Sequence, residues 1–357
     1  MKLFTVGPVQ MQKDILDIGI QQIPYFRTEE FSDILFEVDR MLKTLLQSDN
    51  SNLLISSSGT GAMEAAITNL FNSQDKLLIV NGGSFGQRFV EICQKYNFNY
   101  HEIKLSFGEK LTDQHLIKYL HQNFSGFLIN HHETSTGVLY DLKLVSDFCK
   151  NNNITLVVDA ISSFLSDLGK LDNLSTDILI FSSHKALSLM PGLSIINFSE
   201  KAKMLISQNE SKTYYFDLQK AIQNSLRGQT PFTPSISIIY QLHRRLELLI
   251  QRGGLEVELN KVTKIAEYFR KSIADLPVYI PHYNLSNCLT PIVFKSNSVD
   301  AYNIFEILRN EYELVVNPCG GELKNKMLRI GHIGNLTISD IDLLLDALRD
   351  LERKRII

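Results

Sequence analysis

Short apolar runs alternate with amphipathic stretches through the middle of the chain, a pattern typical of alternating strands and helices. The runs expected to form strands are 52–56, 76–80, 100–104, 126–130, 156–159, 177–181 and 193–198. Between them, 88–97, 112–122 and 142–151 carry apolar residues at helical spacing. This alternation predicts a mostly parallel sheet that helices cover on both faces, with the last run turning back against its neighbours.

Long helices flank the alternation. Residues 29–47 place their apolar side chains on one face behind Thr28, a suitable N-cap, and 236–250 form an apolar helix. A charged helix at 254–274 then leads to a smaller unit. Its strands are expected at 290–294 and 313–317, and its helices at 298–310 and 339–352.

We therefore predict an α/β fold of two domains, for which 357 residues are sufficient. Residues 21–255 form the large domain with the mostly parallel sheet, and 256–357 form a small α+β C-terminal domain. Residues 1–20 hold the turn signal Gly7-Pro8 and a short helix-like stretch, and we expect them to pack with the small domain.

Composition narrows the classes of function. The formal net charge is −3 and no basic stripe is present, so nucleic acid is not expected as a partner. No apolar run is long enough to span a membrane, and the N-terminus does not look like a signal peptide. Four cysteines lie far apart and form no metal or redox motif: Cys93, Cys149, Cys288 and Cys319. These features predict a cytoplasmic protein with reduced thiols.

A lysine, an acid and a glycine turn carry the candidate chemistry. A single lysine is ordinarily a solvated surface residue. Lys185, however, lies just past the strand 177–181, and Asp159 ends an earlier strand. The turn Ser58-Gly59-Thr60-Gly61 opens a helix, whose first N–H groups can bind a phosphate. Together, an amine that forms a Schiff base, a buried acid and a phosphate cradle indicate a pyridoxal phosphate (PLP) site.

Two competing interpretations of these stretches are weaker. The glycine turn resembles the start of a dinucleotide fingerprint, but Glu64 stands where the third glycine belongs. His131, His132 and Glu133 follow the strand 126–130, but adjacent side chains diverge and no third cluster completes a metal site. We therefore predict no metal, and a polar loop at the carboxyl end of a strand, where ligands bind in open α/β sheets.

Three further features have both a structural and a functional interpretation. Phe85 lies among glycines at the end of a strand, where its ring is either a core aromatic or a platform for a flat cofactor. The loop 228–234 is rich in proline and threonine and is either a rigid connection or part of a site. Arg27 precedes a helix and is either a surface residue or a ligand-binding one.

In this order, the motifs resemble those of the class V aminotransferases of PLP fold type I. The similarity is to the alanine–glyoxylate, serine–pyruvate and 2-aminoethylphosphonate–pyruvate aminotransferases, and it runs from Gly7-Pro8 to Arg329-Ile330-Gly331. The resemblance implies that Lys185 is the Schiff-base lysine and general base, and that Asp159 keeps the pyridinium nitrogen protonated. Arg329 would hold the substrate carboxylate through its planar fork.

The same resemblance implies a set of cofactor-binding residues and a homodimer. Phe85 would stack on the ring, Ser135 would lie beside it, and Thr233 would reach the phosphate of the neighbouring subunit. The implied cofactor-binding residues are Ser58, Gly59, Thr60, Phe85, Ser135, Asp159, His184, Lys185 and Thr233. Arg27 lies in a stretch that resembles a substrate-binding one of some members, although their histidine and proline are missing here. His184 stands where the family often has Asn or Gln, and Thr230 where some members have a phosphate-binding tyrosine.

The function that follows is a ping-pong aminotransfer from a small amino donor to a 2-oxo acid such as pyruvate. We favour 2-aminoethylphosphonate, or a related small phosphonate or phosphate amine, because 131–137 and 228–234 look closest to that branch. Alanine or serine with glyoxylate or pyruvate is the alternative. A lyase such as a cysteine desulfurase would need a nucleophilic cysteine, and Cys319 lies nearest to the required place, in surroundings that do not match. A scaffold protein that kept the fold would not need both Lys185 and Asp159.

Overall fold

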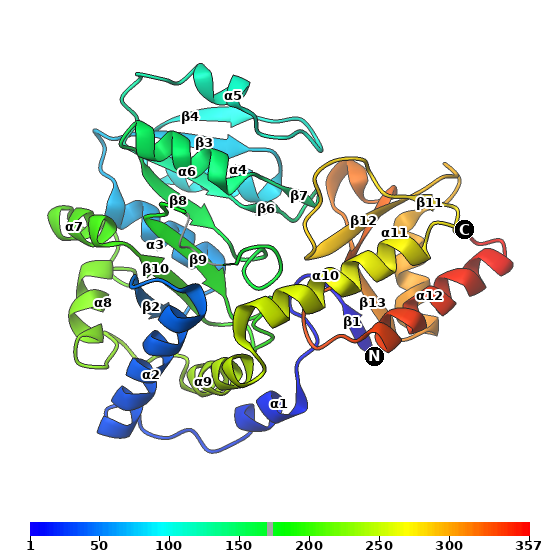
Figure 1. The fold of residues 1–357 in the computed structure, drawn as a ribbon, viewed down its shortest axis with the longest axis horizontal. Coiled ribbons are helices and arrows are strands. Elements are labelled where there is room, and N and C mark those ends of the chain that lie inside the picture. Colours follow the sequence, from blue (N-terminus) through cyan, green and yellow to red (C-terminus); the bar gives the residue numbers. More distant parts are fainter. Residues whose placement is uncertain (170–173) are drawn as a thin grey trace.

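The larger sheet lies within the left-hand part of the molecule in Figure 1, surrounded by helices. The computed structural model describes residues 1–169 and 174–357, and within them this sheet has seven strands. They are β2 (Ser51–Ile55), β3 (Lys76–Asn81), β4 (Asn99–Lys104), β5 (Gly126–Asn130), β8 (Thr155–Asp159), β9 (Ile178–Ser182) and β10 (Ser194–Phe198). Their spatial order is β2-β10-β9-β8-β5-β3-β4, and only β10 runs antiparallel to its neighbours. The predicted mostly parallel sheet with a returning strand is confirmed.

Helices cover both faces of this sheet. One face packs against α3 (Gly59–Leu70), α4 (Ser84–Lys95), α7 (Glu200–Gln208) and α8 (Leu218–Ser225). The other packs against α2 (Glu29–Leu46), α6 (Leu142–Asn151) and α9 (Ile236–Gln251). Because side chains alternate along a strand, Leu179 and Phe181 of β9 enter one apolar cluster and Ile178 and Ile180 enter the other.

A smaller sheet forms the second part of the molecule. Its strands are β1 (Lys2–Phe4), β11 (Val278–Tyr279), β12 (Leu289–Phe294), β13 (Leu314–Pro318) and β14 (Met327–Gly331), in the order β1-β13-β14-β12-β11. The helices α11 (Ala301–Glu311) and α12 (Ile338–Arg353) share its apolar core. The long helix α10 (Gly254–Ser272) extends from α9 to this sheet (Figure 1).

The N-terminal segment connects both parts. β1 pairs in parallel with β13 of the small sheet, whereas α1 (Lys13–Gly19) lies against α9. The segment therefore contacts both the small sheet and the large part. The boundary between 255 and 256 stays a prediction. No helix within the described ranges is long and apolar enough to cross a membrane.

The predicted helices are confirmed except for one that is much shorter than expected. α2 begins at Glu29 as predicted, because the Thr28 Oγ1 accepts the Phe31 N–H at 3.3 Å. The helix expected at 112–122 is wrong beyond its first turns, since α5 covers only Asp113–Ile117. The chain then turns through His121 and Asn123, both in the left-handed region (φ 59° and 53°), so it cannot continue as a helix.

A buried ion pair joins α9 and α10 behind the loop that carries Lys185. Arg245 Nη2 lies 3.0 Å from Glu258 Oε1, and the two side chains are 2% and 9% exposed. Arg245 Nε also donates to the Leu187 carbonyl at 3.1 Å. The pair therefore fixes the backbone two residues after Lys185 to the helices that lead into the small sheet.

Replacing Glu258 tests this pair. Glu258→Ala leaves the Arg245 guanidinium buried without its carboxylate, which costs about 3 kcal/mol of unfolding free energy. The matched control is Glu247→Ala, because Glu247 forms a half-exposed pair with Arg244 on the same helix. The control should lose less than about 1 kcal/mol. Urea denaturation of both variants measures the difference, and equal losses would contradict a special role for the buried pair.

Candidate active site

The candidate residues gather at the carboxyl edge of the large sheet. Parallel strands bring their carboxyl ends to one edge, where loops are free to carry ligand-binding groups. Asp159 ends β8 and Lys185 lies three residues past the end of β9. The first turn of α4, which follows β3, carries Phe85, and the turn between β6 (His132–Glu133) and β7 (Val138–Leu139) carries Ser135. The structure therefore brings the predicted Schiff-base lysine, the acid, the aromatic ring and the serine to one edge of the sheet.

Lys185 is buried at the centre of this edge. Its side chain is 8% exposed. Burial lowers the pKa of its ammonium group, while the nearby Cys288 and Asp159 act in the opposite direction. The neutral amine is the form that attacks a carbonyl carbon. Because a lowered pKa raises the fraction of neutral amine, the surroundings favour Schiff-base formation.

Gly7 of the N-terminal segment packs directly on the Lys185 side chain. A Cβ added at Gly7 would lie 2.5 Å from Lys185 Cδ and 2.8 Å from Nζ. Gly7 also has φ +140°, a conformation that favours glycine. The sequence marked this position only as a turn, but the structure makes it one wall of the lysine pocket.

Asp159 is also buried, and its carboxylate is fixed by the chain that follows it. Its Oδ1 accepts the Ile161 N–H at 2.8 Å. Burial raises the Asp159 pKa to about 6, and the backbone bond and the charge of Lys185 limit the rise. A cation beside this buried acid, such as a protonated ring nitrogen, would stabilise its carboxylate form, which burial alone disfavours.

The start of α3 fits a phosphate group. Ser58 is its N-cap residue, and among the described residues the Gly59 and Thr60 N–H groups have no hydrogen-bond acceptor. The side chain of Ile161, just after Asp159, fills the space where a Gly59 Cβ would stand. The phosphate turn and the acid strand are therefore in direct contact, as one cofactor that spans both would require.

Glu133 holds the ring-stacking and serine residues in place. Its Oε2 accepts the Gly86 N–H at 3.0 Å and the Phe85 N–H at 3.2 Å, at the first turn of α4. Its Oε1 accepts the Ser135 N–H at 3.2 Å. The carboxylate thus caps a helix and aligns Phe85 with Ser135. From the sequence we considered Glu133 only as a possible metal ligand, and this role was not predicted. Its place just after the end of β5, where ligand-binding loops begin, was the signal that could have indicated it.

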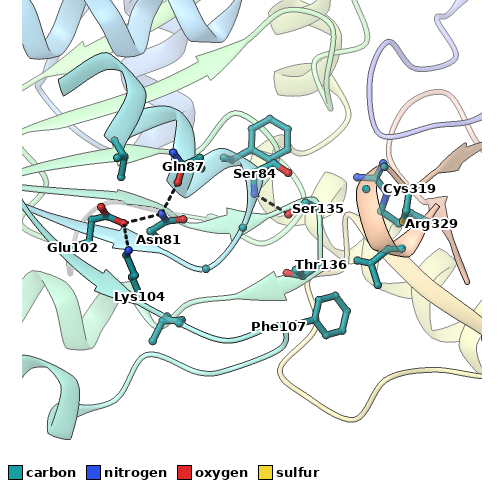
Figure 2. A pocket seen from close by; sticks show the side chains of 18 of the residues that line it. Asn81, Ser84, Gln87, Glu102, Lys104, Phe107, Ser135, Thr136, Cys319 and Arg329 are labelled. Carbon is teal, nitrogen blue, oxygen red and sulfur yellow. Dashed lines mark hydrogen bonds and ion pairs between the residues drawn. The ribbon is translucent and has the colours of Figure 1, made fainter. Parts of the chain in front are cut away.

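Arg329 faces these residues from the small sheet. Its Nη1 donates to the Thr134 carbonyl at 2.8 Å and its Nη2 to the Pro318 carbonyl at 2.7 Å. Its Nε is buried and has no partner in the described structure. A cavity of about 980 Å³ lies between Arg329 and the loops of Phe85 and Ser135. Figure 2 shows Arg329 and Cys319 across this cavity from Ser84 and Ser135.

Of the predicted site residues, Phe85, Ser135 and Arg329 line this cavity, whereas Lys185, Asp159 and the turn Ser58-Gly59-Thr60 are not among its lining residues. Arg27, Thr233 and His184 do not line it either. Arg27 donates from Nη1 to Gln229 Oε1 at 3.0 Å and to the Thr230 carbonyl at 2.8 Å, so it fastens the loop that holds Thr233. Thr233 itself is exposed. His184 is half-buried beside Ser182, and burial lowers its pKa to about 4, so it is neutral at pH 7.

The two histidines after β5 are uncharged at neutral pH in this fold. Both are buried, and desolvation lowers the pKa of His131 to about 3 and that of His132 well below its usual value. His132 Nδ1 lies 3.0 Å from Ser162 Oγ, and its Nε2 is unpartnered. Across residues 1–169 and 174–357, no three potential ligands are grouped to hold a metal ion.

Comparison with known proteins decides the family, since the class-V aminotransferase family model matches residues 25–343. The chain belongs to the class-V aminotransferase family. The soluble hydrogenase 42 kDa subunit of Anabaena cylindrica is 29% identical over 352 residues, covering 96% of this aminotransferase and 90% of that protein. The alanine–glyoxylate aminotransferase of Oryctolagus cuniculus is 28% identical over 362 residues, covering 98% and 91%. The structure of alanine–glyoxylate aminotransferase from Nostoc sp. matches with a TM-score of 0.93 and 26% identity, covering 98% and 95% of the two chains.

These matches confirm a PLP-dependent transaminase of fold type I. The residues present fit the cofactor: a buried amine, a buried acid held by backbone, and unpaired N–H groups at the start of α3. Lys185, Asp159, and the turn Ser58-Gly59-Thr60 would hold its aldehyde, ring nitrogen and phosphate, respectively. The individual roles of these residues stay predictions.

Gly7→Ala tests the wall of the lysine pocket. The added methyl group overlaps the Lys185 side chain and requires a strained backbone, so we expect PLP affinity to fall roughly tenfold. The visible absorption of the lysine-bound cofactor measures it. Gly320→Ala is the control, because Gly320 has φ −110° and no heavy atom within 4 Å of an added Cβ. Unchanged affinity in both variants would contradict the packing.

Asp159→Asn tests the cost of burying the acid. The raised pKa means that the folded protein holds the Asp159 proton more tightly than the unfolded chain does. Ionised Asp159 therefore destabilises the cofactor-free fold above pH about 6, and this cost vanishes as the pH falls towards 3.8. The free energy of unfolding of Asp159→Asn should exceed that of the unmodified protein by an amount on the order of 2–3 kcal/mol at pH 7.5. The difference should be smaller at pH 5.

Urea denaturation of the cofactor-free proteins at both pH values gives this difference. A gain that does not change with pH would show that the Asp159 charge is already compensated by its surroundings.

Proposed function

We propose that this aminotransferase moves the amino group of a small amino acid, alanine or serine, to a small 2-oxo acid such as glyoxylate or pyruvate. The carrying observation is Arg329, which lines the same cavity as Phe85 and Ser135 and whose Nε is buried without a partner among the described residues. A guanidinium group matches the planar carboxylate that both donor and acceptor carry. The relatives named as alanine–, aspartate– and serine–glyoxylate aminotransferases support this choice.

The residues divide the chemistry among them. PLP, when bound, supplies the electron sink for the bond at the substrate Cα. Lys185 Nζ would hold the cofactor until the donor replaces it, and the released amine would then move the proton at the substrate Cα as general base and acid. Asp159 would keep the ring nitrogen protonated through its fixed carboxylate. Arg329 orients the substrate, so that the Cα proton faces Lys185.

2-Aminoethylphosphonate is the second candidate donor. The sequence favoured it because of the stretches 131–137 and 228–234. In the structure, His131 and His132 are buried and neutral, and Gln229 accepts from Arg27 while its amide donates to Ser32 Oγ at 2.8 Å. These side chains offer no positive charge to a phosphonate, so we rank a donor with a carboxylate first.

The homodimer stays part of the proposal. Thr233 is exposed on a loop that Arg27 fastens, in a position to serve a neighbouring subunit rather than its own. Large apolar side chains are exposed on α2, on the segment before it and on the segment before α8; they include Ile23, Tyr25, Phe36, Tyr214 and Tyr215. A second copy would cover such a surface. We also retain the cytoplasmic location as a proposal.

A desulfurase-type lyase receives no support from the geometry. Cys319 is 7% exposed, and burial raises the pKa of its thiol. A cysteine that attacks the sulfur of a substrate cysteine, and so becomes a persulfide, must be an accessible thiolate. Cys319 instead lies fixed beside Arg329 at the cavity (Figure 2).

A panel of donors tests the proposed reaction. Each donor is added without acceptor to the PLP-loaded enzyme, and the visible absorption of the lysine-bound cofactor is followed. We expect alanine or serine to remove this band and glyoxylate or pyruvate to restore it. Loss of the band with 2-aminoethylphosphonate alone would reverse the ranking of donors. No response to any donor would contradict an aminotransferase acting on these substrates.

Arg329→Gln tests the carboxylate site. Loss of the charge-assisted hydrogen bonds should raise the KM for alanine or serine roughly 10²-fold, with the spectrum of the bound cofactor unchanged. Arg309→Gln is the control, because Arg309 forms a surface pair with Glu306. A variant with unchanged KM would remove Arg329 from the substrate site.

A further inference from the structure

The predicted phosphate cradle lacks a cation. Ser58, Gly59, Thr60 and Thr233 offer hydroxyl and backbone N–H groups only. A phosphate monoester carries about −1.5 to −2 charges at pH 7. Helix N-termini offset part of such a charge, but a partial charge of about half a unit leaves most of it. A positively charged side chain beside the start of α3 would therefore complete the site.

Arg88 occupies this place. It lies in the first turns of α4, and its Nη1 is 3.0 Å from Thr60 Oγ1. Its guanidinium carbon lies 4.7 Å from the centre of the Phe85 ring. One side chain thus contacts both a residue predicted to hold the phosphate and the residue predicted to stack on the ring.

The charge of Arg88 is not neutralised by the protein. Within residues 1–169 and 174–357, no carboxylate lies at ion-pair distance from it, whereas the buried Arg245 has Glu258. Arg329 and Arg27, the two arginines that the sequence assigned, each donate to backbone carbonyls of their own surroundings. Arg88 is half-buried, so its charge acts through partly desolvated space.

The field of Arg88 reaches the reacting groups as well. Burial dominates the pKa values of Lys185 and Asp159, and the Arg88 charge adds a smaller lowering effect on both. Arg88 therefore lies close enough to these two groups for its charge to act on both.

We propose that Arg88 binds the phosphate group of PLP, with Thr60 as its partner, and at the same time supports the Phe85 ring on which the pyridine ring lies. The planar fork of arginine suits two phosphate oxygens and leaves its face to the aromatic ring. This inference rests on the PLP site described above and adds a charged residue that the sequence motifs did not assign.

Arg88→Gln separates a phosphate contact from a general effect on the pocket. The dissociation constants of PLP and of pyridoxal, which has no phosphate, are measured from the absorption of the lysine-bound form. If Arg88 binds the phosphate, the variant should bind PLP roughly 10- to 100-fold more weakly and pyridoxal less than about threefold more weakly. Arg88→Lys keeps the charge and should recover most of the PLP affinity.

Two outcomes would overturn the proposal. Equal weakening of PLP and pyridoxal would show that Arg88 acts through Phe85 or through folding, and unchanged PLP affinity would show no contact at all. Arg40→Gln is the matched control, because Arg40 is an exposed residue on another helix, α2. The affinity of this variant for both compounds should equal that of the unmodified protein.

The ³¹P resonance of bound PLP gives an independent readout. A neighbouring guanidinium should keep the phosphate doubly ionised, so that its chemical shift stays constant near pH 6, the usual second pKa of a phosphate monoester. In Arg88→Gln the shift should titrate in this range, and a constant shift there would contradict the proposal. These binding measurements use no amino donor, so a wrong donor assignment would leave them intact.

Discussion

Lys185 and Asp159 lie at the carboxyl ends of neighbouring strands in space that excludes most water, and this desolvation determines what the site can do. It acts on the two groups in opposite directions, lowering the pKa of the amine and raising that of the acid. Both groups therefore tend towards their neutral forms. A cofactor that brings a carbonyl to the amine and a cationic ring nitrogen to the acid would relieve both costs at once, which links cofactor binding to the stability of the fold.

Segments far apart in the chain maintain this dry space. Gly7 arrives from the N-terminal segment, which is attached to the small sheet through β1. The Arg245–Glu258 pair fixes the backbone that follows Lys185 to the helices that lead to the same sheet. Glu133 ties the first turn of α4 to the turn that carries Ser135. The pocket is thus built from both parts of the molecule, so a movement of the small sheet would change the surroundings of Lys185.

Much of this arrangement could be predicted from sequence, because strand ends carry their own signal. Apolar runs that stop at Asp159 and shortly before Lys185 predict that both residues lie at one edge of the sheet. Contacts between distant segments could not be predicted in this way. Gly7 against Lys185, Arg245 with Glu258, and Arg88 beside Thr60 depend on how elements pack, and no local periodicity records that. The helix expected at 112–122 ends early because the backbone turns at His121 and Asn123, and these turns override the helical propensity of the segment.

The most direct measurement locates the lysine that carries the cofactor. The PLP-loaded protein is treated with borohydride, which fixes the bond between amine and cofactor, and the modified peptide is identified by mass spectrometry. The account predicts one modified site, Lys185, and no modification in Lys185→Ala. A modified lysine elsewhere, or no modification of the loaded protein, would contradict the claim that this buried amine is the centre of the active site.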